Sequence, residues 1–434
     1  EEPIDATKNW WGQASGPATG DIVGNVDYTP WYATATTTPD REFVTVKRGE
    51  NIIAYSDTIQ PAIDAASAGD TVNVAAGTYN ENIIINKRIT LQGAGADNTT
   101  ITSAAGSGVI NLTTGGESGT DRMVIKDLKV TGANYDGLTV TGGLGYITFE
   151  NVVATQNNMH GVHIDVATIL KDIKVLGCTF SNNVGCGMQI GSTGGIEGFT
   201  LTNTLMESNN SGLYMAGKIT GMLIDGGSYS NNVAPVSDNS GGVGIYASAA
   251  PGGLNNGFST FGPNTIKNVT VNANSRGIIL NAYSGSAYTF ENITVNDNNF
   301  GDADTDKGQG ITFGWRGATS SQVTFDRVTA TGNTKYDIWL IAYGGTLLDA
   351  LKIKDCTVSG STATSAGKGI ELYSIGTGVI SNAEISECTV TGNNIGISFK
   401  ATSSAANIGN KAIHNIITDN TIGVNNTDPD DVFN

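Results

Sequence analysis

The chain has 434 residues, of which 58 are glycine and only 15% are charged, and its formal net charge is −17. This balance favours β-structure with many turns over helices. The negative charge argues against nucleic acid or an anionic membrane surface as a partner, since both would be repelled, and it makes cations the natural counterpart. No apolar run reaches the roughly eighteen residues that a membrane-spanning helix needs, so we expect no membrane insertion. Nothing in the sequence indicates an organic cofactor.

The chain begins with a tryptophan-rich segment at residues 1–32, before a linker and first strand at 33–49. The motifs NWWG at 9–12 and GNVDYTPW at 24–31 resemble the closing segment of secreted right-handed parallel β-helix proteins, where it normally follows the last coil. Here the segment precedes the repeats. We therefore interpret it as a candidate donor to a neighbouring subunit. The expected residues of that joint are Trp10, Trp11, Tyr28 and Trp31.

The next block predicts the start of a solenoid. Residues 58–68 combine a cap residue, an early proline and an alanine-rich amphipathic stretch, which predicts one short helix capping the front of the array. The segment TVNVAAGTYNEN at 71–82 follows. This block closely resembles the first coil of the pectin lyase-like superfamily, which includes pectin methylesterases, lyases and many surface proteins. The resemblance covers about residues 50–426 and implies a parallel β-helix, whereas it says little about activity.

A repeated strand of the form glycine, apolar, any residue, apolar dominates the rest of the sequence. Gly137 and Gly161 start two such strands 24 residues apart, and Gly242 and Gly277 start two others 35 apart. The period-two alternation places the apolar side chains on one face, and such a unit has to stack on neighbours to bury that face. We therefore predict an all-β fold, a right-handed parallel β-helix (β-solenoid) of roughly 12 coils over 50–426. An acidic C-terminal tail follows at 427–434.

Two smaller residue patterns follow the same repeat. Asparagine pairs such as 157–158 and 298–299 recur before the strand glycines. Asparagine tolerates left-handed backbone, and its amide can bond the same amide one coil away, so the pairs predict turn ladders. Cys178, Cys356 and Cys388 share one local motif and are interpreted as small buried residues, with a disulfide between the last two as the alternative.

The motifs of the well-known polysaccharide enzymes on this fold are missing. The sequence lacks the Asp-Phe-Ile-Phe-Gly strand of pectin methylesterases and the Arg-x-Pro-x-x-Arg of common pectate lyases, and the segment MHGVH at 159–163 lacks the acids of polygalacturonases. An enzyme is therefore the less favoured interpretation. If the chain is one, we expect a polysaccharide lyase or glycoside hydrolase, with the catalytic candidates Arg316, Glu371 and Tyr373. Outward aromatic side chains either support the ladders or stack on sugar rings, and the candidates for glycan contact are Tyr214, Tyr246, Trp339 and Tyr373.

Two further patterns concern cations and covalent glycans. In the loop at 301–310, Asp302, Asp304 and Asp306 occupy alternate positions, a spacing that lets oxygens converge on Ca²⁺. Lys307 departs from the EF-hand pattern, and a solvated acidic insertion is the alternative. N-glycosylation motifs give weak support for an exported protein and begin at Asn98, Asn111, Asn209, Asn268, Asn292 and Asn425.

Two functional hypotheses result. The preferred one is a structural extracellular or cell-surface glycoprotein, calcium-stabilised, whose partner is itself. Its subunits would join head to tail into filaments, with residues 1–32 completing the C-terminal coil of the next subunit. The alternative is a protein that binds or degrades a cell-surface polysaccharide with its outward aromatic face. Residues 1–32 would also be explained by a segment that folds back on its own front, or by truncation of a longer protein.

Overall fold

The structure, a computed structural model, describes residues 3–35, 44–103, 108–191, 193–233, 241–247, 263–282, 287–299, 308–316, 322–363, 367–402 and 405–427. The chain forms two compact units. We call them unit 1 (residues 1–166 and 170–184) and unit 2 (residues 167–169 and 185–434).

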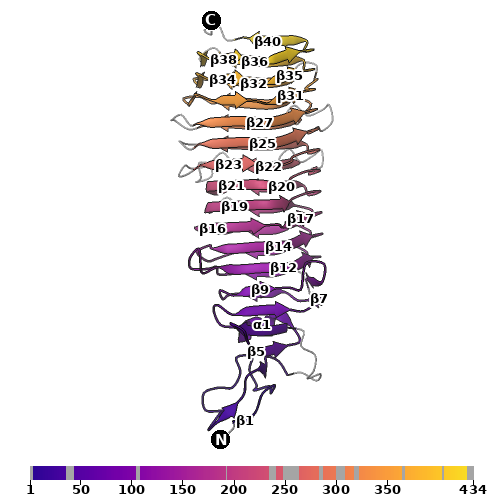
Figure 1. The fold of residues 1–434 in the computed structure, drawn as a ribbon, viewed down its shortest axis with the longest axis vertical. Coiled ribbons are helices and arrows are strands. Elements are labelled where there is room, and N and C mark those ends of the chain that lie inside the picture. Colours follow the sequence, from indigo (N-terminus) through magenta and orange to yellow (C-terminus); the bar gives the residue numbers. More distant parts are fainter. Residues whose placement is uncertain are drawn as a thin grey trace. The chain divides into compact units, whose positions relative to one another are not determined.

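Almost all regular structure in the described chain is β-strand (Figure 1). The first unit contains β1 (Ile4–Asp5), β2 (Val26–Asp27), β3 (Trp31–Tyr32), β4 (Val44–Arg48), β5 (Asn51–Ser56), α1 (Ile59–Ala65), β6 (Thr71–Val74), β7 (Gly77–Asn80), β8 (Ile83–Ile85), β9 (Thr90–Gln92), β10 (Thr99–Thr102), β11 (Ile110–Leu112), β12 (Met123–Thr131), β13 (Leu138–Val140), β14 (Ile147–Thr155), β15 (Val162–Ile164), β16 (Ile169–Leu176) and β17 (Thr179–Ser181).

The second unit continues with short strands throughout. Its elements are β18 (Cys186–Ile190), β19 (Gly195–Leu205), β20 (Ser211–Met215), β21 (Lys218–Ser228), β22 (Val243–Ala247), β23 (Asn264–Lys267), β24 (Arg276–Ala282), β25 (Tyr288–Asn296), β26 (Gln309–Trp315), β27 (Val323–Thr331), β28 (Tyr336–Ala342), β29 (Leu347–Asp349), β30 (Lys352–Lys354), β31 (Thr357–Ser359), β32 (Lys368–Ser374), β33 (Val379–Ser381), β34 (Glu384–Ser386), β35 (Thr389–Thr391), β36 (Ile395–Ala401), β37 (Ala406–Ile408), β38 (Lys411–Ile413), β39 (Ile416–Thr418) and β40 (Ile422–Asn426).

The strands of each unit pair in parallel with equivalent strands one coil away. In unit 1, β8, β11, β13 and β15 place Ile83, Ile110, Leu138 and Val162 in one buried column. In unit 2, the strands β18, β20, β22, β24, β26, β28, β32, β36 and β40 form the sheet that we call the unit 2 sheet (Figure 1). Its buried column runs through Ile245, Ile278, Ile311, Ile338, Ile370 and Ile397. Full burial of each such side chain contributes roughly 1.5–3 kcal/mol. The predicted all-β parallel solenoid is confirmed.

The helix α1 forms where the sequence predicts it but is shorter than residues 58–68. Its N-terminus is capped from a distant position, because the carboxylate of Glu81 accepts the N–H groups of Ile59 and Gln60 at 2.9–3.1 Å. Thr58 is the N-cap residue and makes no side-chain cap bond. At the other end the ammonium of Lys87 donates to backbone carbonyls at 2.6–3.1 Å. Both helix ends are therefore satisfied by charged side chains from the next turn of the solenoid.

The predicted asparagine ladder lines a buried turn. In unit 2 the amide of Asn232 donates to Asn274, that of Asn274 to Asn298 and that of Asn298 to Asn333, at 2.9–3.0 Å. All four side chains are fully buried. The preceding member of one pair, Asn231, instead adopts a φ of 57°. One asparagine of that pair therefore turns the backbone and its neighbour bonds the next coil.

The strand glycine is required by close packing against this ladder. A Cβ added at Gly310 would lie 2.6 Å from the carbonyl oxygen of Asp337 and 2.8 Å from the amide nitrogen of Asn333. Asp337 replaces the glycine one coil on, and its carboxyl accepts a 2.7 Å hydrogen bond from Asn333. Burial raises the pKa of Asp337 well above its ordinary value, although hydrogen bonds from Asn333 and Ser361 oppose the shift.

The N-terminal segment pairs with its own chain. In β3, Trp31 and Tyr32 lie parallel to Ala54 and Tyr55 of β5, and both are buried. The indole N–H of Trp31 donates to the carbonyl of Ala14 at 2.9 Å. This arrangement corresponds to the fold-back explanation of residues 1–32. Joining of the segment to a second subunit stays a prediction.

All four cysteines lie buried with free thiols. Burial raises the pKa of Cys178 to about 12, so this thiol is unreactive at neutral pH. The thiols of Cys356 and Cys388 donate to the backbone carbonyls of Lys354 and Ser386, each at 3.2 Å. The interpretation as small buried residues is confirmed, and in the structure the alternative Cys356–Cys388 disulfide is not formed.

Candidate functional site

The outer face of the unit 2 sheet gathers aromatic and charged side chains from neighbouring strands. On β28, the rings of Tyr336 and Trp339 stack with centroids 4.5 Å apart and planes 10° apart. On β32, Lys368 and Glu371 form an ion pair with the same spacing of three residues. Because Tyr336 pairs with Lys368 and Trp339 with Glu371 in the strand register, the four side chains form one continuous surface.

The preceding strand extends this surface with polar groups. Gln309 and Thr312 of β26 pair in register with Tyr336 and Trp339. They are only 5% and 7% exposed, and Gln309 Oε1, Thr312 Oγ1 and the indole nitrogen of Trp339 lack a hydrogen-bond partner among the described residues. Leaving such atoms unpaired beneath the surface is costly, so they weaken the local packing. We call Gln309, Thr312, Tyr336, Trp339, Lys368 and Glu371 the outer patch.

The glycan-contact candidates all lie on this sheet. Tyr214 of β20 and Tyr246 of β22 stack at 4.7 Å with planes 21° apart. Tyr373 of β32 lies beneath the ammonium of Lys400, 4.5 Å from its ring centroid. With Trp339, these side chains form half-buried flat surfaces. Half-buried aromatic rings are suited to contact with the apolar face of a sugar.

The three catalytic candidates make separate contacts. Arg316 lies over the ring of Tyr343 at 3.6 Å. Glu371 is 1% exposed, is paired with Lys368, and accepts a 3.3 Å hydrogen bond from Ser398. Tyr373 and Glu371 do share the outer face of β32, two residues apart. A general acid or base has to reach the proton it transfers, and the Glu371 carboxylate is already enclosed and neutralised.

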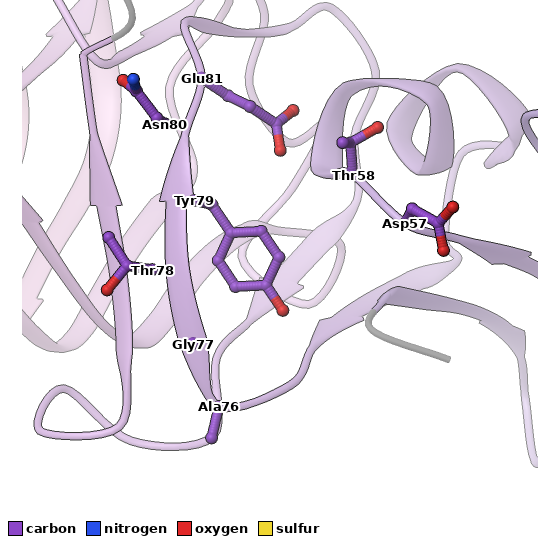
Figure 2. A pocket seen from close by; sticks show the side chains of 8 residues that line it. All are labelled: Asp57, Thr58, Ala76, Gly77, Thr78, Tyr79, Asn80 and Glu81. Atoms are coloured by element: carbon purple, nitrogen blue, oxygen red, sulfur yellow. The ribbon is translucent and has the colours of Figure 1, made fainter. Parts of the chain in front are cut away.

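A surface cavity of about 360 Å³ lies in unit 1 beside α1 (Figure 2). Figure 2 shows Tyr79 and Glu81 on its wall, with Asp57 and Thr58 opposite. The Glu81 carboxylate is occupied by the helix N-terminus, and the Tyr79 hydroxyl donates to the carbonyl of Ala75 at 3.1 Å. Burial raises the pKa of Tyr79, and the nearby Glu81 charge adds to the rise. Glu81 therefore caps the helix, whereas Tyr79 bonds the turn at Ala75.

A second cluster, in unit 1, combines Asp136, His160 and His163. His163 Nδ1 lies 3.0 Å from one carboxylate oxygen of Asp136, and the backbone N–H of His160 donates to the other oxygen at 3.0 Å. The two imidazole centroids are 5.1 Å apart. Sequence analysis noted the histidines at 159–163 but missed Asp136, because nothing in its local sequence distinguishes it from a turn residue.

The electrostatics of this cluster differ from group to group. Burial lowers the pKa of His160 to about 4, so its imidazole is neutral at pH 7. Burial also opposes the charged form of His163, but its hydrogen bond to Asp136 and the charges of Asp136 and Asp165 raise its pKa overall. For Asp136, burial acts upward, yet the hydrogen bonds from His163 and His160 lower the pKa overall.

The remaining predicted sites fall into two groups. Asp302, Asp304 and Asp306 lie outside the described residues, so the calcium loop stays a prediction.

Among the glycosylation motifs, Asn98, Asn268 and Asn292 are exposed, and Asn111 and Asn425 are half-buried. Asn209 is 3% exposed and its amide donates to Asn232 in the ladder, so a glycan at this position would require the turn to open. Glycosylation at all six positions stays a prediction.

The strand register and buried ladders define the chain as an all-β parallel β-solenoid. Solved structures to which it is similar include the A-module of the Azotobacter vinelandii mannuronan C-5 epimerase AlgE4, at 15% identity over 87% of this chain and 94% of that one, with a TM-score of 0.40. A catalytic domain of GH87 α-1,3-glucanase in complex with tetrasaccharides matches at 15% identity over 93% and 70%, with a TM-score of 0.41. Pectate lyase Pel9A matches at 14% identity over 96% and 80%, with a TM-score of 0.34. No protein-family model and no curated protein matches the chain.

Among the described residues, no helix is both long enough and apolar enough to span a membrane.

Proposed function

We propose that the protein binds a polysaccharide along the outer face of the unit 2 sheet. The observation that carries this proposal is the set of half-buried aromatic side chains on this face, which are Tyr214, Tyr246, Trp339 and Tyr373. Neighbouring strands of a sheet lie about 4.8 Å apart. Tyr214 and Tyr246 lie on adjacent strands in one column, Trp339 lies in the same column three strands further on, and Tyr373 lies in the next outward column. Aromatic side chains spread over several coils suit an extended chain of sugars.

The charges on this face favour an acidic polysaccharide. The protein as a whole carries a formal charge of −17, yet Lys400 and Arg316 lie over the rings of Tyr373 and Tyr343. The carboxylate of the outer patch, Glu371, is neutralised by Lys368. Cations placed beside sugar-stacking rings would pair with the carboxylates of a uronic acid polymer.

We propose binding without cleavage. The carboxylate of Glu371 is enclosed by Lys368 and Ser398, and the guanidinium of Arg316 stacks on the ring of Tyr343. Incubating the protein with uronic acid polymers should therefore give no rise in ultraviolet absorbance from unsaturated product. A rise that disappears in a Glu371→Gln variant would contradict this part of the proposal.

Replacing Trp339 with alanine tests the binding site directly. Loss of the indole removes one stacking surface worth about 1 kcal/mol, so affinity for uronic acid oligosaccharides should fall several-fold to tenfold, as measured by titration calorimetry. Tyr336→Ala should act similarly. Tyr135→Ala is the matched control, because Tyr135 is a 54% exposed tyrosine of unit 1.

The affinities of these variants distinguish binding at the proposed site from non-specific binding elsewhere on the protein. Equal affinity in the wild type, Trp339→Ala and Tyr336→Ala, with all three folded, would overturn the proposed site. Affinity that falls with salt and exceeds that for a neutral glucan would support the acidic class. Head-to-tail assembly, an extracellular location and calcium binding stay predictions from the sequence.

A further inference from the structure

We propose that Asp136, His160 and His163 form a binding site for a divalent transition metal ion, with Zn²⁺ as the representative. One ligand atom from each residue lies within 4.8 Å of the other two. The cluster belongs to unit 1 and shares no residue with the outer patch. The inference is therefore independent of polysaccharide binding.

The repeat itself brings these three residues together. Asp136 and His160 each precede a strand glycine, Gly137 and Gly161, so they occupy equivalent places in successive turns. His163 follows on β15, where it pairs in register with Thr139 on the outer face of β13. The carboxylate of Asp136 therefore comes from one turn and the imidazole of His160 from the equivalent turn of the next coil. The imidazole of His163 comes from the strand that follows that second turn.

The separations fit a metal ion at ordinary bond lengths. Two ligands at about 2.1 Å from a metal, with angles between octahedral and tetrahedral values, are about 3.0–3.4 Å apart. His163 Nδ1 and the nearer Asp136 oxygen are already 3.0 Å apart. No two of the three ligand atoms are more than 4.8 Å apart, so His160 would have to approach by at most about 1.4–1.8 Å. Rotation of its side chain supplies such a movement more readily than a change in the strand would.

The carboxylate is held in place before any ion binds. The backbone N–H of His160 fixes one oxygen of Asp136 at 3.0 Å and leaves the other facing His163. That oxygen and the two imidazoles make a nitrogen-rich set, which suits Zn²⁺, Cu²⁺ or Ni²⁺ and not Ca²⁺, whose ligands are oxygens. Three protein ligands also leave at least one coordination position for water or an exogenous ligand.

The experiment measures zinc binding to the full chain by competition with a chromophoric chelator. Zinc affinity of the wild type should fall at least about tenfold in His163→Asn and in Asp136→Asn, with His160→Asn as a third variant. The chain has three histidines, and the exposed His414 in unit 2 provides the matched control, so His414→Asn should retain affinity within twofold. Calcium should not compete for the site.

A second readout identifies the ligands and guards against misfolding. Cobalt(II) bound by the wild type should give a visible absorption spectrum that His163→Asn lacks, while circular dichroism shows both proteins folded. Asp136→Asn keeps an oxygen able to accept the His160 N–H, so loss of zinc in this variant cannot be attributed to loss of that bond. Zinc binding that is unchanged in folded His163→Asn and Asp136→Asn, or no stoichiometric binding in the wild type, would overturn the site in favour of a plain Asp–His hydrogen bond.

Discussion

The interior and the outer face of the unit 2 sheet are built by the same strands, yet the repeat has different consequences on the two sides. The inner column repeats isoleucine at Ile245, Ile278, Ile311, Ile338, Ile370 and Ile397. One residue further along each strand, the outer column reads Tyr246, Ile279, Thr312, Trp339, Glu371 and Ser398.

This difference separates the positions that determine packing from the positions that are available for recognising a ligand. Inside the coil, close packing demands an apolar side chain of similar size at every level, because each side chain has to fill the space above its predecessor. The outer column follows no such repeat, and successive coils differ in chemistry even where Thr312, Glu371 and Ser398 are buried. Stability should therefore depend on the inner columns, and ligand recognition on the outer ones.

The largest expected effect comes from a break in an inner column. Phe325 stacks on Phe290 with centroids 4.4 Å apart and planes 1° apart, and both rings are buried. Phe325→Ala should lower the free energy of unfolding by about 3–5 kcal/mol, since it leaves a cavity in the column. The control variant is Thr324→Ala, which changes the adjacent outward residue and should lower the free energy of unfolding far less. Urea unfolding that affects both variants equally would contradict the contrast between the two faces.

A matched pair of asparagines should show an intermediate effect. Asn298 is fully buried and bonds both Asn333 and the carbonyl of Val271 at 2.9 Å. Asn298→Ala should cost about 1–3 kcal/mol because it leaves buried donors and acceptors unpaired. Asn292 is exposed, has a φ of 51° that glycine also tolerates, and bonds Asn268 at 2.8 Å, so Asn292→Gly should change stability far less. Comparable melting temperatures for the two variants would show that the buried ladder has no special weight.

A smaller effect is expected at Asp337, and it depends on pH. Its pKa is raised in the folded protein, so its contribution to stability is complete below the unfolded carboxyl pKa and is lost as pH rises through the folded value. Asp337→Asn removes the loss of stability with rising pH, because the amide does not ionise. Its oxygen can still accept the hydrogen bond from Asn333. The variant should be more stable than the wild type by about 1 kcal/mol or more at pH 7, with the gap narrowing near pH 4. A gap that widens on acidification would refute this assignment.

Sequence analysis succeeded where one residue type recurs at fixed places in the coil. The strand glycines, the asparagine pairs and the alternating isoleucines predicted the solenoid, the turn ladder and the inner column. It also placed Tyr214, Tyr246, Trp339 and Tyr373 on one outer face, since alternation along a strand fixes which side a residue takes. These features depend on local backbone geometry repeated at every level.

Contacts between different residue types in successive coils could not be predicted from the sequence, because no repeated residue marks them. Glu81 caps α1 from 22 residues away, and Asp136 meets His163 at a separation of 27. The strand period varies from 24 residues between Gly137 and Gly161 to 35 between Gly242 and Gly277.

The sequence by itself therefore determined the fold and the side of the sheet that each residue occupies. Only the tertiary structure decided which outward side chains meet, and so revealed the outer patch and the Asp136 cluster. The physical reason is that side-chain alternation is a property of a single strand, whereas the turns between strands vary in length and set the alignment of one coil on the next.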